Sequence, residues 1–275
     1  MRLRKWPATL AVLLAVFLDA SAATADETAV ELTYEIFIAG IRVGQVDAVG
    51  TFVDNGGYAL ALRGYTDGVS RLVSDASAEL ASNGFIRNAE MVPATFEMAM
   101  MENGIGAYAE MLMRGRTITN LTVVPGLLPS EHRVPLTLTH TRDVVDPMSG
   151  LIAPIDDLEV DGAEACNRRI KVFDGWQRFD VVLDYASTET VFGTREGYSG
   201  DVFVCSARYV PVAGHRSDQP SVMFMAENER LEARLVQIPD HRVLVPYQIL
   251  IGTEAGDLVV RMVRFRVDGT AGGDG

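Results

Sequence analysis

The sequence has few cysteines, few basic residues and few long apolar runs, and these shortages exclude several classes of protein. Lysine and arginine number 24 against 37 acidic residues, giving a formal net charge of −13. So acidic a chain argues against binding to nucleic acids or anionic membrane surfaces. With 48% hydrophobic and 22% charged residues, the composition excludes disordered, collagen-like and coiled-coil chains. At 275 residues, the chain can bury a core that needs no metal or disulfide to hold it.

One apolar run stands out, at the N-terminus. Residues 10–18 are apolar, follow three basic residues and precede two A-x-A cleavage sequences that end at Ala22 and Ala25. The run is too short to span a membrane, which needs about 20 residues. No cysteine directly follows either cleavage sequence, so a lipid-anchored terminus is not expected. The pattern predicts a secretory signal peptide over residues 1–25 and an exported mature chain without a transmembrane segment.

The two cysteines, Cys166 and Cys205, form an even pair in an exported chain, which predicts a disulfide. The alternative is a redox or metal pair. Such a pair usually has C-x-x-C spacing or a histidine at ligand spacing, and the sequence has neither. We therefore predict a structural disulfide, no metal site and no cofactor.

Apolar and polar residues alternate with a period of two along most of the chain, which predicts β-strands. Residues 243–251 form a nearly continuous apolar run, which predicts a strand covered on both faces. Glycine-containing turns are predicted at residues 54–57, 83–84 and 254–257. Long meanders with short turns indicate an all-β fold, a single highly curved antiparallel sheet of half-barrel or barrel-like form. One β-rich domain is expected over residues 26–267, followed by a disordered tail at 268–275.

Signals for helices are sparse, so only one or two short helices are expected. Residues 70–82 have helical spacing of apolar residues but fit a strand equally well. Asp146 and Pro147 are a better helix start, with aspartate as N-cap and proline at the first helical position. Pro154 would end that helix after one or two turns.

Catalytic motifs are absent or incomplete. Residues 197–201 resemble a nucleophile elbow, but the last position is Asp201 and a strand pattern follows, so a turn is predicted. Residues 104–109 loosely fit a dinucleotide-binding pattern but are better interpreted as a hairpin loop. The four histidines show no metal or catalytic spacing. No catalytic residue is predicted. The sequence leaves open whether residues far apart in the chain come together to form a catalytic site.

Two features suggest a binding site. Methionines flank a glycine-rich turn, and Arg261 is in phase with the apolar residues of the last strand. Thioethers bind Cu(I) or line adaptable apolar pockets, and copper is disfavoured because no histidine or cysteine neighbours them. Arg261 could hold an anionic group, pair with an acid, or lie outside because the strand phase slips at a bulge. If the sheet encloses a cavity, the residues expected to line it are Met98, Met100, Met111, Met113 and Arg261.

The strand and turn at residues 32–44 resemble the start of an exported proteobacterial family of unknown function, numbered 3108, and residues 146–150 are similar to its central D-P-x-S element. Leu244-Val-Pro246 before a last hairpin is also similar. The resemblance covers residues 30–267. The motif residues are Tyr34, Gly40, Gly44, Asp146, Pro147 and Ser149.

This resemblance implies a β-rich periplasmic protein of the cell envelope, and by looser analogy a curved half-barrel that binds acyl chains or partner proteins. The leading hypothesis is a non-enzymatic binding or scaffolding protein for a lipid-like or protein ligand. One alternative is a hydrolase of envelope polymers that uses dispersed carboxylates, which requires two carboxyls to converge in a cleft. The other is a purely structural envelope protein, which predicts a filled interior.

Overall fold

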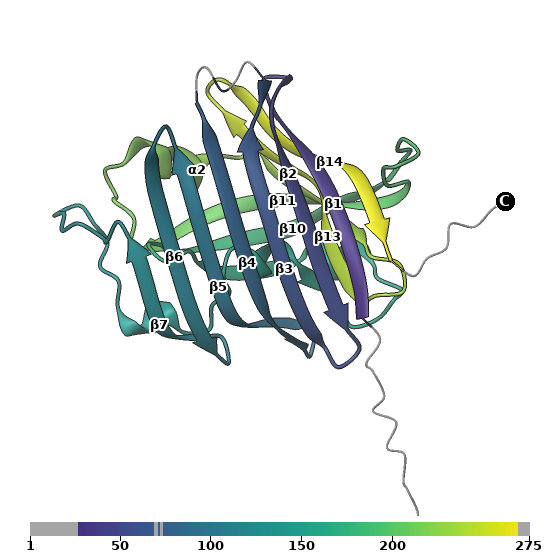
Figure 1. Cartoon of the computed structure of the whole chain (residues 1–275), viewed down its shortest axis with the longest axis horizontal. Coiled ribbons are helices and arrows are strands. Elements are labelled where there is room, and N and C mark those ends of the chain that lie inside the picture. Colours follow the sequence, from purple (N-terminus) through teal and green to yellow (C-terminus); the bar gives the residue numbers. More distant parts are fainter. Residues whose placement is uncertain (1–26, 69–70, 72–73, 269–275) are drawn as a thin grey trace, which may run out of the picture.

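The computed structural model describes residues 27–68, 71 and 74–268. The predicted signal peptide and residues 269–275 of the predicted tail lie outside the described residues. The described chain forms one antiparallel sheet of 14 strands, which confirms the predicted fold class (Figure 1). The strands are β1 (Glu27–Ile38), β2 (Ile41–Val53), β3 (Gly57–Thr66), β4 (Ala76–Arg87), β5 (Glu90–Glu102), β6 (Ile105–Arg114), β7 (Thr117–Val124), β8 (Ala153–Pro154), β9 (Arg168–Phe173), β10 (Arg178–Val191), β11 (Gly200–Ala213), β12 (Leu231–Gln237), β13 (Val243–Thr253) and β14 (Gly256–Val267).

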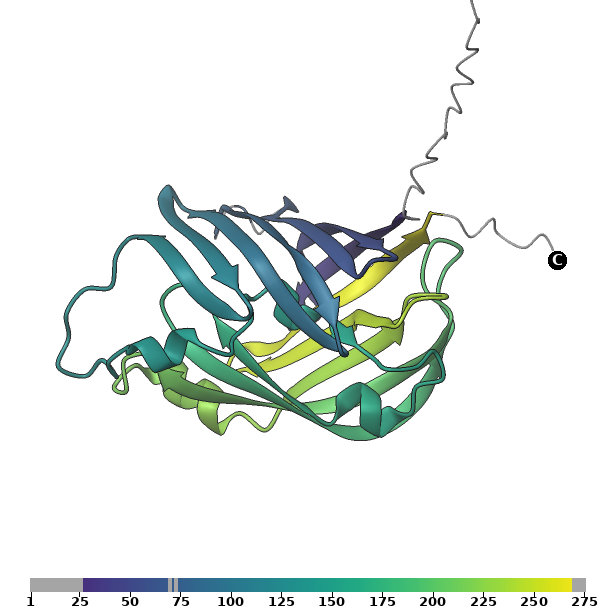
Figure 2. The same ribbon diagram turned by 90° about the horizontal axis from the view of Figure 1, so that it is seen from below.

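The sheet is a meander whose first and last long strands meet. Its order is β7-β6-β5-β4-β3-β2-β1-β14-β13-β12-β11-β10-β9, and β8 pairs with β13 off this path. Strands β1–β7 form the N-terminal half and β8–β14 the C-terminal half. The two halves face each other as two layers that are joined through β1 and β14, so the sheet is strongly curved (Figure 2).

The alternation of buried and exposed residues along the strands explains why the two halves pack as layers. In β3, Tyr58 and Leu60 are buried while Ala59 and Ala61 are exposed. In β13, neighbouring residues are buried on opposite faces, because Val243 and Val245 join the main core cluster whereas Leu244 joins a second one. The prediction that this strand is covered on both faces is therefore confirmed for its first residues.

Two of the three predicted turns are confirmed and one is wrong. Residues 54–57 and 254–257 connect β2 to β3 and β13 to β14. Asn83 and Gly84 instead lie inside β4 at a β-bulge. A Cβ atom on Gly84 would lie 2.4 Å from the carbonyl oxygen of Val92, so glycine there permits close strand contact rather than a turn. The chain turns at Asn88 and Ala89, both with positive φ.

The described residues contain two short α-helices, as predicted, α1 (Gly162–Cys166) and α2 (Pro220–Glu227). Residues 76–82, which fitted either element, are strand. The helix expected after Asp146 is one 3₁₀ turn, η3 (Ser149–Leu151), and another 3₁₀ turn, η2, spans Leu138–Thr141. No helix among the described residues is long and apolar enough to cross a membrane.

The predicted disulfide between Cys166 and Cys205 is confirmed, with the two Cα atoms 5.4 Å apart. It ties α1 to β11, and both cysteines are fully buried in the second core cluster with Leu183 and Leu235.

Residues 142–152, which we call the central segment, lie between the two halves of the sheet. Arg142 forms a bridge with Thr117 of β7, and Val145 forms one with Val172 of β9. Strands β7 and β9 are the two ends of the sheet order. The central segment therefore contacts both edges and covers backbone groups that would otherwise be unpaired.

Candidate functional site

Two apolar hollows lie beside the central segment. The first, of about 250 Å³, is lined mainly by β1–β3, β13 and the central segment. The second, of about 220 Å³, is lined mainly by β9–β13 and the central segment. They share Leu151, Pro246 and Ile249. The two hollows therefore adjoin at these three residues, of which Leu151 belongs to the central segment.

Asp146 fixes the turn that carries Leu151. One carboxylate oxygen accepts hydrogen bonds from the backbone N–H groups of Met148 and Ser149, at 2.9 and 3.0 Å. The other accepts the hydroxyls of Ser82 and Ser149, at 2.9 and 2.5 Å. The Asp146 side chain thus closes the turn that leads into η3, although the N-cap position of η3 is Met148 and not Asp146 as predicted. Asp146 is fully buried, and burial raises the pKa of its carboxyl despite these hydrogen bonds.

Two buried tyrosines form hydrogen bonds to residues beside the hollows. Tyr58 of β3 donates its hydroxyl to Ser149 at 2.7 Å, because the hydroxyl of Ser149 is itself directed at Asp146. Tyr34 of β1 donates to the carbonyl oxygen of Pro246 at 2.7 Å. Burial raises the pKa of both phenols, so both stay neutral donors at physiological pH.

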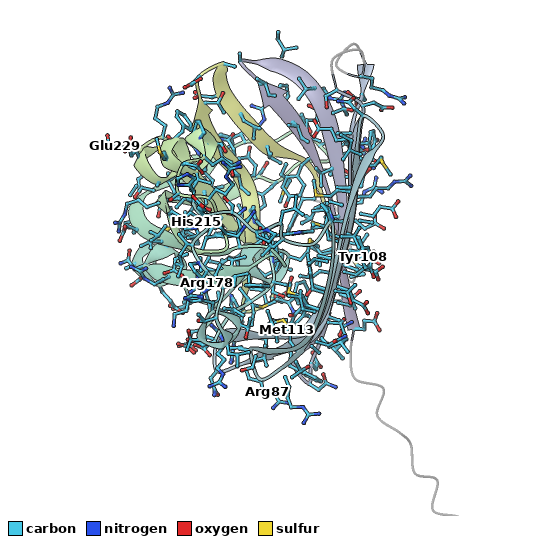
Figure 3. The ribbon with its side chains drawn as sticks, turned by 90° about the vertical axis from the view of Figure 1, so that its left-hand side faces the viewer. Arg87, Tyr108, Met113, Arg178, His215 and Glu229 are labelled. Carbon is cyan, nitrogen blue, oxygen red and sulfur yellow. A yellow bond between two sulfur atoms is a disulfide. The ribbon has the colours of Figure 1, made fainter. Side chains whose placement is uncertain are left out.

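The residues predicted to line the site lie elsewhere. Met98, Met111 and Met113 are buried in the main core, and Met100 is 44% exposed. Figure 3 shows Met113 on the side of β6 that faces the C-terminal half. None of these four methionines lines the first or second hollow. The inward strand phase was recognised from sequence, but close packing against the opposite half leaves no space beside them.

Arg261 lies on the outer face of β14, where its guanidinium is 5.2 Å from the ring centroid of Phe37. The expectation that it points into a cavity is wrong, and the alternative of a phase slip is confirmed. The register shifts where β1 passes from Thr33 to Tyr34, opposite Arg264 and Met262. One extra residue in β14 therefore puts Met262 and Phe265 on the inner side and Arg261 outside.

Sequence reasoning missed the residues that do line the hollows. Leu151 follows a polar motif, and Ala48 and Ala233 look like ordinary positions of alternating strands. Small side chains at inward positions leave space, but a sequence does not reveal what faces them. The family-motif residues were identified, and Tyr34, Asp146 and Ser149 now have hydrogen-bonding roles in this site.

A polar hollow of about 600 Å³ at one end of the sheet bears on the hydrolase alternative. It is lined by Asp54, Asp156, Asp240 and His241, and the three aspartates are exposed. A carboxyl that acts as a general acid near neutral pH usually needs burial to raise its pKa. Burial raises the pKa of Asp146, which lies elsewhere and has a structural role.

Burial also raises the pKa of Asp174, which again has a structural role. Its carboxyl accepts hydrogen bonds from the backbone N–H groups of Trp176 and Gln177 in a turn. Among the described residues, no three His, Cys, Asp or Glu side chains are grouped to hold a metal ion. Ser199, of the sequence that resembles a nucleophile elbow, accepts the backbone N–H of Gly193 in the loop between β10 and β11, as predicted for a turn.

Comparison with known proteins gave one family and distant structures. The family described as "Protein of unknown function (DUF3108)" matches residues 33–263. A β-barrel-like protein of the DUF1849 family from Brucella abortus is 8% identical, with a TM-score of 0.47 over 90% of this chain and 99% of that one. A DUF1329 family protein from Desulfovibrio piger is 12% identical, with a TM-score of 0.22 over 90% and 88%. No curated protein matched.

Proposed function

This chain belongs to the DUF3108 family, and we propose that it is a non-catalytic protein of the periplasm that binds an acyl chain between the two halves of its sheet. The observation that carries the proposal is the pair of adjoining apolar hollows at Leu151. Together they have the size of a pocket for a small ligand, for which about 300–1,000 Å³ is typical.

The chemistry of the lining favours a hydrocarbon. Of the described residues that line the first hollow, only Tyr34 carries a side-chain hydroxyl, and it already donates to Pro246. A polar solute would lose its hydrogen bonds to water there without replacing them. An acyl chain loses none and gains contact with apolar walls, at about 25 cal/mol per Å² removed from water.

The same argument disfavours a protein ligand inside the hollows. A peptide carries a backbone N–H and C=O at nearly every residue, and these need partners when buried. The strands around the hollows already pair their own backbone groups in the sheet. The hollows also argue against a purely structural protein, for which a filled interior is expected.

Export to the periplasm is part of the proposal. A disulfide persists in oxidising compartments, and the pair Cys166–Cys205 is closed. The N-terminal pattern of basic residues, an apolar run and A-x-A sequences fits a secreted chain.

Binding of a fluorescent polyene fatty acid tests the proposal. Ala48→Phe should fill the first hollow and Ala233→Phe the second, and each should weaken binding at least tenfold while the protein stays folded. Ala81→Phe is the matched control, because Ala81 is exposed on β4 and should leave affinity unchanged.

Native mass spectrometry of protein extracted gently from cells supplies an independent measurement. We expect a bound species of lipid mass in the natural chain and its loss in Ala48→Phe. If the purified protein carries no lipid and does not bind the fluorescent acid saturably, the proposal is wrong.

A further inference from the structure

We propose that the ligand ends in an anionic headgroup, a carboxylate or a phosphate, which binds at a small basic pocket that opens beside both apolar hollows. This inference rests on the proposed function and specifies the ligand class of the same site. We call the pocket the basic mouth; it has a volume of about 150 Å³. It lies between the turn joining β4 to β5, the edge strand β9 and the end of the central segment.

The basic mouth adjoins both hollows. Ile152 lines the basic mouth and the first hollow, while Ile170 lines the basic mouth and the second. A ligand with its hydrocarbon in either hollow can therefore place its polar end in the basic mouth. An apolar region with a polar exit is what an amphipathic molecule requires.

Positive charge gathers at this pocket in a chain whose net charge is −13. Among the described residues, four cationic residues line the basic mouth against a single acid, Glu90. The four are Arg116, Arg168, Arg169 and Lys171. Lys171 is the only lysine after residue 5, and the other three cations are arginines.

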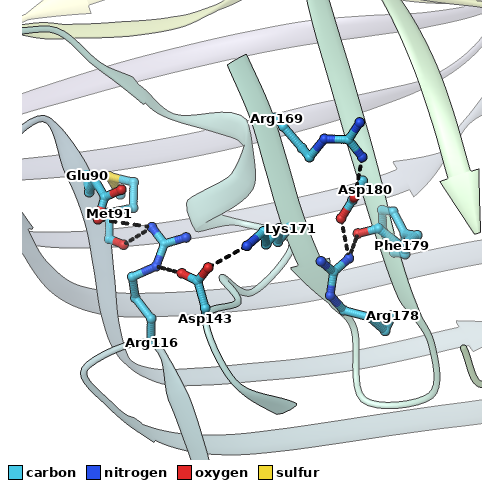
Figure 4. Close-up of polar contacts among 9 residues, drawn as sticks. All are labelled: Glu90, Met91, Arg116, Asp143, Arg169, Lys171, Arg178, Phe179 and Asp180. Atoms are coloured by element: carbon cyan, nitrogen blue, oxygen red, sulfur yellow. Dashed lines mark hydrogen bonds and ion pairs between the residues drawn. The ribbon is translucent and has the colours of Figure 1, made fainter. Parts of the chain in front are cut away.

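The nearby carboxylates do not neutralise this charge. Asp143 is shared by Arg116, at 3.0 Å, and Lys171, at 2.5 Å (Figure 4). Asp180 is likewise shared by Arg169, at 2.6 Å, and Arg178, at 2.5 Å. Each of these acids faces two cations, and Glu90 adds a weaker contact of 3.7 Å to Arg116. The cluster keeps a positive excess that favours an additional anion.

Arg168 is the strongest individual candidate. Within the part of the chain that the structure describes, its guanidinium donates to the backbone carbonyl oxygens of Pro154, at 3.1 Å, and Glu164, at 2.6 Å, and not to a carboxylate. Its Nε atom is buried without a hydrogen-bond partner among the described residues. Burial lowers the pKa of this group more than the negative charge of Glu164 raises it, and among the described residues the guanidinium has no directly paired counter-charge. A carboxylate or phosphate would supply that charge with strong, directional hydrogen bonds.

Calorimetry with three ligands of equal chain length tests the inference. Palmitate has a carboxylate, a 16-carbon lysophosphatidic acid has a phosphate, and hexadecanol has an uncharged headgroup. We expect at least one anionic ligand to bind about tenfold or more tighter than hexadecanol, the order given by one charge-assisted hydrogen bond. The tighter of the two anions identifies the headgroup.

Two variants and one control locate the effect. Arg168→Gln and Lys171→Gln should each weaken binding of the preferred anion about tenfold and leave hexadecanol unchanged. Lys171 is 39% exposed, so its variant is expected to fold even if the Arg168 variant does not. Arg266→Gln, an exposed arginine of β14, is the control and should change neither ligand.

The outcomes separate this inference from the proposed function. Equal affinity of the natural chain for hexadecanol and both anions would overturn the headgroup assignment and leave acyl binding standing. The headgroup assignment would also be wrong if Lys171→Gln bound the preferred anion as the natural chain does. Absence of binding by all three ligands would overturn both proposals.

Discussion

The hydroxyl of Tyr34 donates a 2.7 Å hydrogen bond to the carbonyl oxygen of Pro246, although 212 positions separate the two residues. Tyr34 lies on β1 and pairs with Met262 of β14, so its side chain reaches across a whole strand to β13. The register of β12 and β13 shifts beside Pro246, a position where a strand tolerates proline. This bond therefore joins the two halves of the sheet where the apolar hollows meet.

Tyr34→Phe should lower the free energy of unfolding by about 1–3 kcal/mol, because a buried carbonyl loses its partner while the packing of the ring is kept. Urea denaturation measures the change. Tyr65→Phe is the control, since Tyr65 is 36% exposed, and it should change stability little. Equal effects of the two variants would contradict a structural role for the Tyr34 bond.

Asp146 should hold the central segment in place. Asp146→Ala leaves two backbone N–H groups and two hydroxyls without their acceptor and should destabilise by about 3 kcal/mol or more. Asp146→Asn keeps one acceptor oxygen and the shape, so its cost should be smaller. Urea denaturation at pH 7 compares the two, and a similar small cost for both would be inconsistent with this role.

The pH dependence of stability follows from the raised pKa of Asp146. The folded state holds this proton more tightly than the unfolded state, where the pKa is near the ordinary 3.8. Stability relative to Asp146→Asn is therefore greatest below pH 3.8 and falls as pH rises through the folded pKa. Unfolding of both proteins between pH 3 and 7 tests the sign, and a relative gain of stability with rising pH would refute it.

Leu151 should limit the length of the bound chain. Leu151→Ala would join the two hollows, so the acyl length that binds tightest should increase in a series of fatty acids. The cost in stability should be about 1–3 kcal/mol, below that of a fully buried leucine, because Leu151 is 38% exposed. Leu138→Ala, at a leucine that is 77% exposed, should leave both quantities unchanged. An unaltered length preference in Leu151→Ala would exclude a dividing role.

The disulfide should contribute much of the stability of the C-terminal half. It closes a loop of 39 residues, for which chain entropy gives about 4 kcal/mol. The double variant Cys166→Ser, Cys205→Ser should unfold at lower urea and be insensitive to reductant, whereas the natural chain should approach it when reduced. A natural chain with the same urea midpoint in both conditions would show that the bond contributes nothing.

Local patterns were enough to predict most strands but not their phase. A bulge adds one residue and reverses which side the following side chains face. This occurs where Thr33 and Tyr34 meet β14, and it is why Arg261 lies outside. A bulge also occurs at Gly84, where an apparent turn is continuous strand. Both depend on the neighbouring strand, which a single strand's sequence does not specify.

By itself, the sequence determined the β-rich fold, the disulfide and the family, because alternation, paired cysteines and short motifs are local properties. The tertiary structure decided which inward faces are packed and which are hollow. The methionines of β5 and β6 and the small residues of β2 and β12 share the same alternating pattern. Only the side chains opposite them, supplied by strands far away in the chain and by the central segment, distinguish core from site.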